Sequence, residues 1–587
     1  MSEVVQRDQY WRSEVRDGMQ IEWQVPIPMD DGVVLRADVY RPPGEGAVPA
    51  LLTYGPYAKG LAFQEGYARQ WEQLSREAPE ALRGSSNRYQ NWEAVDPEKW
   101  VPDGYACVRV DSRGAGWSPG RLEVWSPREA RDLYACIEWA AAQPWSTGKV
   151  GLCGISYYAM NQWQVAGLQP PHLTAMVAWE GAADWYREVY YHGGIHSQFV
   201  AGWFPRQVTT VQYGLGERGP RNPTTGEPVA GPVTLSEEEL ARNRVDTAAE
   251  AKRHPLDDEW HRKRSADWSR VRTPFLSSAN WGGQGLHPRG NLEAFVEAAA
   301  EQKWLDVHGD THFTCFYTDY GVQMQKRFFG YFLKGLDSGW DREPRVRLQI
   351  RHADGRFVER HENEWPLART RWTPFYLDPR TEGFASDPPQ PGEAAYDALG
   401  EGLQFSTPPL TEELEITGPV AARLWVSSST TDADLFLVLR VFDPAGREVV
   451  FQGSNDPNTP IGLGWLRASH RKLDAARSLP YRPYHAHDEL QPLTPGEVYP
   501  LDIEIWPTSI VLAPGYRLAL AVRGRDYEYG GEIDEATRAL GYKGCGPFVH
   551  QDPEDRPTST FGGRVTVYAG GETPSHLLLP VIPGGPR

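Results

Sequence analysis

Short apolar runs alternate with amphipathic helical segments in a regular rhythm from residue 105 to residue 185. YACVRVDSRG is typical of a strand ending in a glycine turn, PREARDLYACIEWAAAQP of an amphipathic helix, and KVGLCGIS of a second strand followed at once by the helical YYAMNQWQVAG. LTAMVAWEG, TPFLSSANW and KWLDVHG continue the series. Strands separated by helices pair in parallel, so this rhythm predicts an α/β class with a parallel sheet.

The rest of the chain predicts further domains around this sheet. The 587 residues exceed what one core normally holds. Residues 60–100 are polar and look like an insertion, and residues 185–270 are too long for a plain crossover, so we expect a helical cap there. Near 345 the pattern changes to short alternating runs such as DLFLVLRVFDP and YRLALAVRG, typical of a jelly roll. The predicted division is a core at 1–184 and 271–344, a cap at 185–270 and an all-β domain at 345–587.

Composition narrows the class of partner. Lys and Arg number 60 against 78 Asp and Glu, a net charge of −18, which disfavours nucleic acid and anionic membrane surfaces. No apolar run approaches the roughly 18 residues of a membrane helix. The start, MSEVVQRDQYWRSEV, lacks a leader pattern, so we expect a cytoplasmic protein. The five cysteines form no C-x-x-C pair, and DSRGAGWS lacks the spacing of a nucleotide fingerprint, so no metal and no cofactor are expected.

The clearest local motif is Gly154-Ile155-Ser156-Tyr157-Tyr158, between a strand and a helix. A serine on such a turn stands at the carboxyl edge of the sheet with its hydroxyl exposed, and the helix N-terminus stabilises negative charge beside it. The motif departs from G-x-S-x-G, because Tyr158 replaces the last glycine. The context predicts that Ser156 is a nucleophile.

A serine nucleophile needs a base, and in such folds the histidine follows the final strand. Two of the 15 histidines lie there, in His308-Gly309-Asp310-Thr311-His312. His312 lies farther along the loop and could reach Ser156, whereas His308 is closer to the strand and fits a structural role. Their i, i+4 spacing resembles a metal pair, but the residues between them predict a loop and no third ligand is apparent.

Taken together, these segments resemble the CocE/NonD family of serine hydrolases, which is related to X-Pro dipeptidyl-peptidases and α-amino-acid ester hydrolases. The resemblance is carried by DGVVLRADVYRP, GPYAKG, DSRGAGWSPG, IEWAAAQPWSTGKVGLCGISY and HGDTH with FFGYFLKG. It implies an α/β-hydrolase core with a C-terminal jelly roll. It also implies that His312 serves as base and then acid for Ser156, and that the Tyr157 N–H and the Tyr57 hydroxyl form the oxyanion hole.

The sequence departs from the family at the acid of the triad. The position that matches the family's aspartate is Gly283, and no carboxylate follows before Glu293. A triad still needs a group that orients the imidazole. Glu180 ends LTAMVAWEG, the strand after the nucleophile's own, so we expect it at the same edge and predict that it is the acid. Asp184, Asp310 and an acid-less dyad are the alternatives.

Three functions stay open at this point. The first is hydrolysis of small carboxylic esters. The second is cleavage of an amide, an α-amino-acid ester or an N-terminal dipeptide, for which Glu180 or Asp184 would hold the substrate's ammonium group. The third is a binding protein with an inactive core, suggested by the missing aspartate. Trp179, Trp185 and Trp281 flank the predicted edge, and we expect substrate contacts from Asp184, Trp179 and Trp281. A homo-oligomer is also left open.

Overall fold

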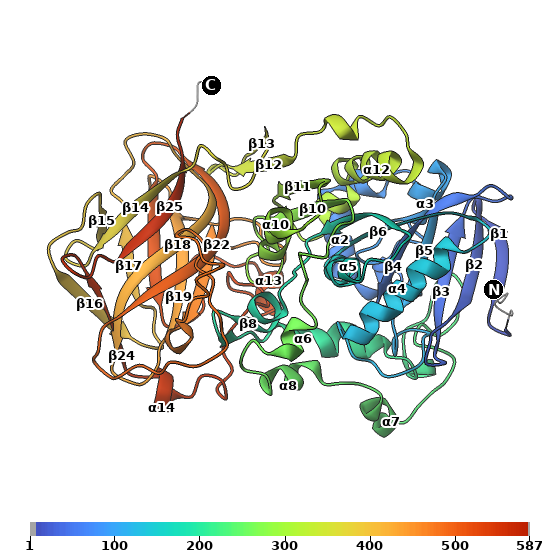
Figure 1. The fold of residues 1–587 in the computed structure, drawn as a ribbon, viewed down its shortest axis with the longest axis horizontal. Helices are drawn as coiled ribbons and strands as arrows, with labels where there is room; N and C mark the ends of the chain where they lie inside the picture. The colour runs from blue at the N-terminus through green and yellow to red at the C-terminus, as the bar shows by residue number, and fades with distance from the viewer. Residues whose placement is uncertain (1–7, 585–587) are drawn as a thin grey trace.

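The computed structural model describes residues 8–584, which form two large sheets at opposite ends of an elongated body (Figure 1). The first sheet has eleven strands in the order β1-β2-β3-β5-β4-β6-β7-β10-β11-β12-β13. From β5 to β12 all neighbours are parallel, and antiparallel strands flank them on both sides. The strands are β1 Arg12–Arg16, β2 Met19–Pro28, β3 Val34–Arg41, β4 Val48–Gly55, β5 Ala106–Asp111, β6 Ser146–Ile155, β7 Leu173–Trp179, β10 Phe275–Asn280, β11 Lys303–His308, β12 Val346–Arg351 and β13 Phe357–Glu362. The predicted parallel sheet is therefore present.

Helices cover both faces of this sheet, which explains why its central strands are apolar almost throughout. Leu152 of β6 packs into a core shared with α4, α5 and α10, whereas Cys153 beside it packs into a core shared with α12. The side-chain alternation of a strand thus serves two cores at once. These helices are α4 Pro127–Ala141, α5 Tyr157–Leu168, α10 Pro288–Glu297 and α12 Asp319–Lys334.

The first sheet extends past residue 345, where the β-rich domain was predicted to begin. β12 continues the parallel order, with Leu305 of β11 opposite Val346, and β13 pairs with β12 as a hairpin. Both strands were expected in the β-rich domain. Their short alternating pattern identifies a strand but carries no information on which sheet it joins, because that depends on long-range pairing.

The second sheet has twelve strands and closes on itself. Its order is β16-β24-β18-β22-β21-β19-β23-β17-β15-β14-β25, β20 pairs with β19, and β25 also pairs with β18. The closure surrounds a core of aliphatic side chains. The strands are β14 Arg371–Asp378, β15 Gly383–Ala385, β16 Gly392–Asp397, β17 Leu403–Ser406, β18 Leu414–Ser428, β19 Asp434–Phe442, β20 Glu448–Val449, β21 Gly462–Arg467, β22 Tyr499–Leu512, β23 Arg517–Arg523, β24 Arg564–Ala569 and β25 His576–Ile582.

Short helical segments fill the remaining stretches. Residues 60–100 hold α1 Phe63–Gly66, α2 Ala68–Glu77, η1 Pro79–Leu82 and α3 Pro97–Trp100, and η2 Val101–Asp103 follows. Residues 185–270 hold η3 Trp185–Tyr190, β8 Tyr191–His192, β9 Ile195–His196, α6 Phe199–Trp203, η4 Phe204–Val208, η5 Thr209–Val211, η6 Gly216–Arg218, α7 Glu237–Arg242, α8 Thr247–Lys252 and α9 Glu259–Arg262. Later come α11 Thr314–Tyr317, η7 Trp340–Arg342, η8 Ala468–His470, α13 Glu535–Ala539 and α14 Thr558–Phe561. The stretch 185–270 is thus a series of single turns rather than a bundle of long helices.

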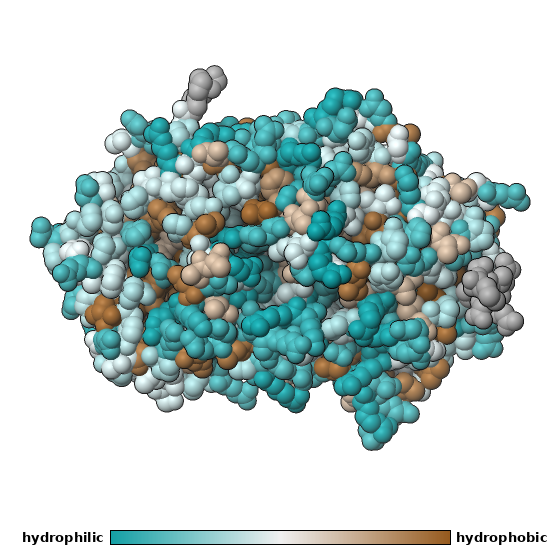
Figure 2. Space-filling model, viewed as in Figure 1, coloured by the Kyte–Doolittle hydropathy of each residue, from teal (hydrophilic) through white to brown (hydrophobic). Residues whose placement is uncertain are grey.

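The visible surface is mainly hydrophilic, with apolar residues scattered over it in small groups (Figure 2). Between residues 8 and 584, no helix is both long and apolar enough to cross a membrane.

A buried carboxyl group joins the start of α4 to the start of α5, next to Ser156. Glu129, in the first turn of α4, accepts hydrogen bonds from the Trp125 N–H at 2.6 Å and from the Tyr157 hydroxyl. Burial raises the pKa of Glu129 to about 8, outweighing these hydrogen bonds. The carboxyl group is therefore largely protonated at neutral pH.

Replacing Glu129 with glutamine should remove a pH dependence of stability. The folded pKa of about 8 lies above the ordinary glutamate pKa of about 4.5, so folding takes up a proton between these pH values. The contribution of Glu129 is full below pH 4.5 and declines as the pH rises to 8, by about 1.4 kcal/mol per pH unit. Urea unfolding from pH 5 to pH 8 should show this decline in the wild type relative to Glu129→Gln. Parallel curves for the two proteins would contradict the assignment.

Candidate active site

Ser156 occupies a strained turn between β6 and α5. Its backbone has φ 54° and ψ −112°, and its N–H donates to the Trp179 carbonyl at 3.0 Å. Positive φ at a non-glycine residue is costly and persists where the surrounding structure enforces it. The strain lifts the serine above the end of β6, as predicted from the strand-turn-helix motif.

The tyrosine that replaces the last glycine of the motif is accommodated by two other glycines. A Cβ at Gly154 would lie 2.4 Å from the Tyr158 Cβ, and a Cβ at Gly55 would lie 2.7 Å from its ring. Neither position has room for a side chain. The departure from G-x-S-x-G therefore leaves the turn intact, because β4 and β6 together leave space for the Tyr158 ring.

His312 lies in the loop after β11, held by a carboxylate on each ring nitrogen. Nδ1 lies 2.9 Å from Glu180 Oε2, and Nε2 lies 2.9 Å from Glu93 Oε1. Burial acts to lower the pKa of His312, but the charge of Glu180 and the hydrogen bonds to both carboxylates outweigh it and raise the pKa to about 10. The imidazole is thus fixed in orientation and protonated on both ring nitrogens in this structure.

Glu180 lies at the end of β7 with φ 48° and no exposed surface. Its Oε1 accepts from Asn280 Nδ2 at 3.1 Å, and its Oε2 accepts from the Ser454 hydroxyl at 2.9 Å as well as from His312. Burial acts to raise the pKa of Glu180, but the charge of His312 and the hydrogen bonds from His308 and His312 hold it well below its usual range. Glu180 is therefore an ionised carboxylate oriented toward His312.

The glycine that takes the place of the family's aspartate has little room for a side chain. A Cβ at Gly283 would lie 3.0 Å from Pro288 Cδ and 3.2 Å from the Ser454 Oγ, and one at Gly282 would lie 2.5 Å from the Gly453 Cα. A loop of the second sheet therefore packs directly on the turn after β10. Because β7 and β10 are parallel neighbours, a carboxylate at the end of β7 reaches the same edge.

Sequence reasoning missed two residues that reach the site. His287 Nε2 lies 3.3 Å from the Ser156 Oγ, and its ring stacks on His312 at 5.2 Å and 14°. Burial and the charge of His312 lower the pKa of His287 to about 3, so this ring is neutral. It lies in the loop after β10, which the sequence analysis had searched for carboxylates alone.

Glu93 is the second missed residue, and it comes from the stretch 60–100 that looked like a simple insertion. Its carbonyl accepts the Ile155 N–H at 3.1 Å, which fixes the segment beside the Ser156 turn. Burial raises the pKa of Glu93 despite the hydrogen bond to His312, and its Oε2 is buried without a hydrogen-bond partner. No local motif marks Glu93 in the sequence.

Of the two predicted oxyanion donors, Tyr157 directly follows Ser156, and Tyr57 packs on the two tyrosines after it. Tyr157 is the first residue of α5, so its N–H has no acceptor within the helix. The Tyr57 ring makes edge contacts with the rings of Tyr157 and Tyr158, and its hydroxyl accepts from Trp203 Nε1 at 3.2 Å. Burial raises the pKa of Tyr57 well above its usual range, so the hydroxyl stays protonated and can donate.

The residues predicted to contact the substrate are buried or engaged by other side chains. Trp179 is wholly buried and packs on His308, Trp185 is also wholly buried, and Trp281 is 1% exposed with its Nε1 donating to a backbone carbonyl. Asp184 caps η3 and pairs with Arg187 at 2.9 Å. Large apolar side chains at strand ends pack between the layers of the fold. In this structure none of the three tryptophans is therefore exposed to a substrate.

His308 has a structural environment, as expected. Its Nδ1 lies 3.2 Å from both Asp306 Oδ2 and Ser278 Oγ, and its Nε2 lies 3.5 Å from Glu180 Oε1. Burial acts to lower its pKa, but these two carboxylates raise it to about 9. Within the described part of the chain, no group of three or more His, Cys, Asp or Glu side chains has a metal-binding arrangement.

A cavity of about 230 Å³, which we call the mouth, adjoins the site. Two of its lining residues contact the candidate site and a third is adjacent in sequence: Trp203 donates to Tyr57, Ser454 donates to Glu180, and Phe313 follows His312. The mouth is lined by Arg69, Gln70, Gln73, Phe199, Trp203, Arg206, Gln207, Phe313, Gln452, Ser454, Asn455, Leu540, Tyr542 and Pro547.

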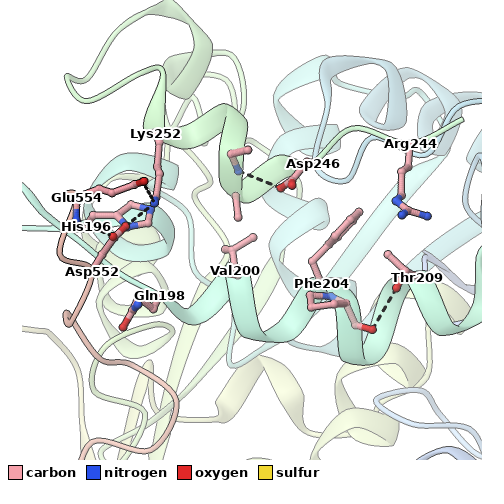
Figure 3. Close-up of a pocket in the computed structure, with 14 residues that line it drawn as sticks. His196, Gln198, Val200, Phe204, Thr209, Arg244, Asp246, Lys252, Asp552 and Glu554 are labelled. Carbon is pink, nitrogen blue, oxygen red and sulfur yellow. Dashed lines mark hydrogen bonds and ion pairs between the residues drawn. The ribbon is translucent and has the colours of Figure 1, made fainter. Parts of the chain in front are cut away.

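A second cavity, of about 530 Å³, lies between α6, α8 and the loop near residue 552 (Figure 3). Its lysine is already neutralised: Lys252 Nζ lies 2.6 Å from Asp552 and 2.8 Å from Glu554. No lining residue of this cavity makes a described contact with Ser156, His312 or Glu180.

Comparison with known families matches both halves of the chain. Residues 31–314 match the model of the X-Pro dipeptidyl-peptidase (S15 family), and residues 338–578 match that of the X-Pro dipeptidyl-peptidase C-terminal non-catalytic domain. Among curated relatives, cocaine esterase of Rhodococcus sp. (strain MB1 Bresler) is 26% identical over 95% of this chain and 98% of its own. A putative Xaa-Pro dipeptidyl-peptidase of Streptomyces avermitilis is 23% identical over 73% of this chain and 68% of its own.

Solved structures share the whole architecture. An α-amino acid ester hydrolase superposes with a TM-score of 0.65 at 17% identity, over 99% of this chain and 98% of its own, which shows a common fold. A CocE/NonD family hydrolase from Staphylococcus aureus superposes with a TM-score of 0.82 and is 31% identical, over 96% of this chain and 94% of its own. On this likeness along nearly the full length of both chains, the protein belongs to the CocE/NonD family of hydrolases.

Proposed function

We propose that this serine hydrolase cleaves carboxylic esters of small molecules, with Ser156 as nucleophile and with His312 and Glu180 completing the triad. The observation that carries the proposal is the buried contact of 2.9 Å between Glu180 and His312, at the edge where Ser156 stands. The relatives named as esterases support the ester class.

The reaction proceeds in two balanced steps. Ser156 Oγ attacks the ester carbon as its proton passes to His312 Nε2, and the resulting oxyanion is held by the Tyr157 N–H and the Tyr57 hydroxyl. Collapse expels the alcohol, which takes the proton from His312. Water then attacks the acyl-enzyme by the same route and releases the acid. Glu180 keeps the imidazole in the required tautomer throughout.

The structure represents the resting state in this account. Ser156 contacts His287, while Glu93 occupies His312 Nε2. We propose that substrate entry turns the Ser156 side chain toward His312 and that the proton between His312 and Glu93 passes from the imidazole to Glu93, leaving Nε2 free to act as base. His287 fits the base role less well, because its Nδ1 is buried without a partner that would orient it.

The dipeptidase alternative requires carboxylates that hold a free ammonium group. The side chains that line the mouth include two arginines and no acidic residue. Asp184 is neutralised by Arg187, and Glu180 is engaged by His312. These arrangements favour an ester without an amino terminus.

We assign the architecture in family terms as well: an α/β-hydrolase core, a cap formed by 185–270 and a C-terminal jelly roll. The closed twelve-stranded sheet supports the last assignment. The cytoplasmic location and the homo-oligomer stay predictions.

Replacement of Ser156 by alanine tests the function directly. We expect kcat/KM on 4-nitrophenyl hexanoate to fall at least 10³-fold, because the acyl-enzyme cannot form. The wild type should leave alanyl-proline 4-nitroanilide nearly untouched. Equal ester turnover in Ser156→Ala, or a preference of the wild type for the anilide, would overturn the proposal.

Removal of the Ser454 hydroxyl should weaken the triad from the C-terminal domain. A hydrogen bond to a charged group contributes about 1.5–3 kcal/mol, so Ser454→Ala should lower kcat about tenfold while KM changes little. Ser454→Thr keeps a hydroxyl and should restore part of the loss. Ser469→Ala, at a buried serine of the same domain, is the matched control. Equal effects of the two alanine variants would mean that Ser454 acts only through folding.

A further inference from the structure

The mouth adjoins the candidate site through Trp203 and Ser454, which contact Tyr57 and Glu180, and both domains build it. Phe199, Trp203 and Phe313 come from the catalytic half, whereas Leu540 and Tyr542 come from the C-terminal half. These side chains form apolar walls next to Tyr57 and His312. An alkyl or aryl group of an ester would lie against them, because such surface gains most from leaving water.

Two cations, Arg69 and Arg206, line the same cavity, and their closest described contacts are to backbone carbonyls. Arg69 donates to the Ala536 carbonyl at 3.2 Å, and Arg206 donates to the Gly202 carbonyl at 2.7 Å. Within residues 8–584, neither guanidinium takes part in an ion pair with an acidic side chain. The charge of Arg69 helps to lower the pKa of Asp534, whose carboxylate caps α13 by accepting the Thr537 N–H at 2.9 Å.

The charge of the mouth is opposite in sign to the net charge of the protein. The chain carries a net charge of −18, yet the side chains that line the mouth carry two positive charges and no negative one. In the cavity of Figure 3, by contrast, Lys252 is already paired with Asp552 and Glu554. The remaining polar side chains that line the mouth are mostly amides, whose NH₂ groups can donate hydrogen bonds to anionic oxygens.

We propose that the mouth selects esters that carry a carboxylate remote from the scissile carbonyl, held by Arg69 and Arg206 while the apolar part of the substrate lies on the aromatic walls. Guanidinium groups match the planar geometry of a carboxylate and bind it through paired N–H donors. This inference rests on the proposed esterase function and adds a substrate class to it.

Three acyl esters of equal chain length test the selection. They are 4-nitrophenyl hexanoate, mono-4-nitrophenyl adipate, which carries a terminal carboxylate, and 4-nitrophenyl 6-aminohexanoate, which carries a terminal ammonium group. A matched leaving-group series consists of phenyl acetate, 3-acetoxybenzoate and 3-acetoxyphenyl-trimethylammonium. In at least one series the wild type should prefer the anion over the neutral ester by about tenfold in kcat/KM and disfavour the cation. Added salt should reduce the preference.

Arginine variants locate the effect. The double variant Arg69→Gln/Arg206→Gln should bring the ratio of anionic to neutral kcat/KM close to one. Arg564→Gln removes an exposed arginine on β24, in the C-terminal domain, and should leave the ratio unchanged. A wild type without anion preference in both series, or a preference that survives in the double variant, would overturn the inference. Loss of all ester turnover in the wild type would instead contradict the proposed function, which keeps the two failures distinct.

Discussion

The contact between Glu180 and His312 is the constraint on which the arrangement of the candidate active site depends. A carboxylate with no exposed surface is expensive to ionise unless charge and hydrogen bonds compensate for its lost hydration. Glu180 has both, from His312, Asn280 and Ser454. The surrounding groups keep the ionised form and direct it at one ring nitrogen. Removal of this contact would leave a buried charge and an imidazole without a fixed tautomer.

The C-terminal domain takes part in this arrangement although its family model is described as non-catalytic. Its loop approaches the turn after β10 so closely that Gly282 and Gly453 meet backbone to backbone. The approach brings Ser454 against Glu180, and the Ser454 carbonyl also accepts the His312 N–H at 3.0 Å. The crowding that disfavours an aspartate at Gly283 is thus the same contact that supports Glu180 on the neighbouring strand.

Sequence patterns predicted the features that depend on neighbouring residues along the chain. Alternating apolar runs marked the parallel sheet, and the strand-turn-helix motif marked Ser156. The adjacency of consecutive parallel strands placed Glu180 at the right edge. Such patterns do not predict contacts between distant segments. Glu93 belongs to an irregular insertion, and β12 joins the sheet through long-range pairing. The tryptophans are buried between the layers of the fold. His287 was missed because the search of its loop considered carboxylates only.

The kinetics of Glu180→Gln on 4-nitrophenyl hexanoate test the central claim most directly. Glutamine keeps the shape of the side chain but stabilises the wrong tautomer and no longer stabilises the imidazolium. We expect kcat to fall about 10³–10⁴-fold with KM nearly unchanged. Circular dichroism should show an intact fold, and Glu180→Asp provides a second variant if the glutamine protein is unstable. Turnover of folded Glu180→Gln within tenfold of the wild type would contradict the account and direct attention to His287 as the base.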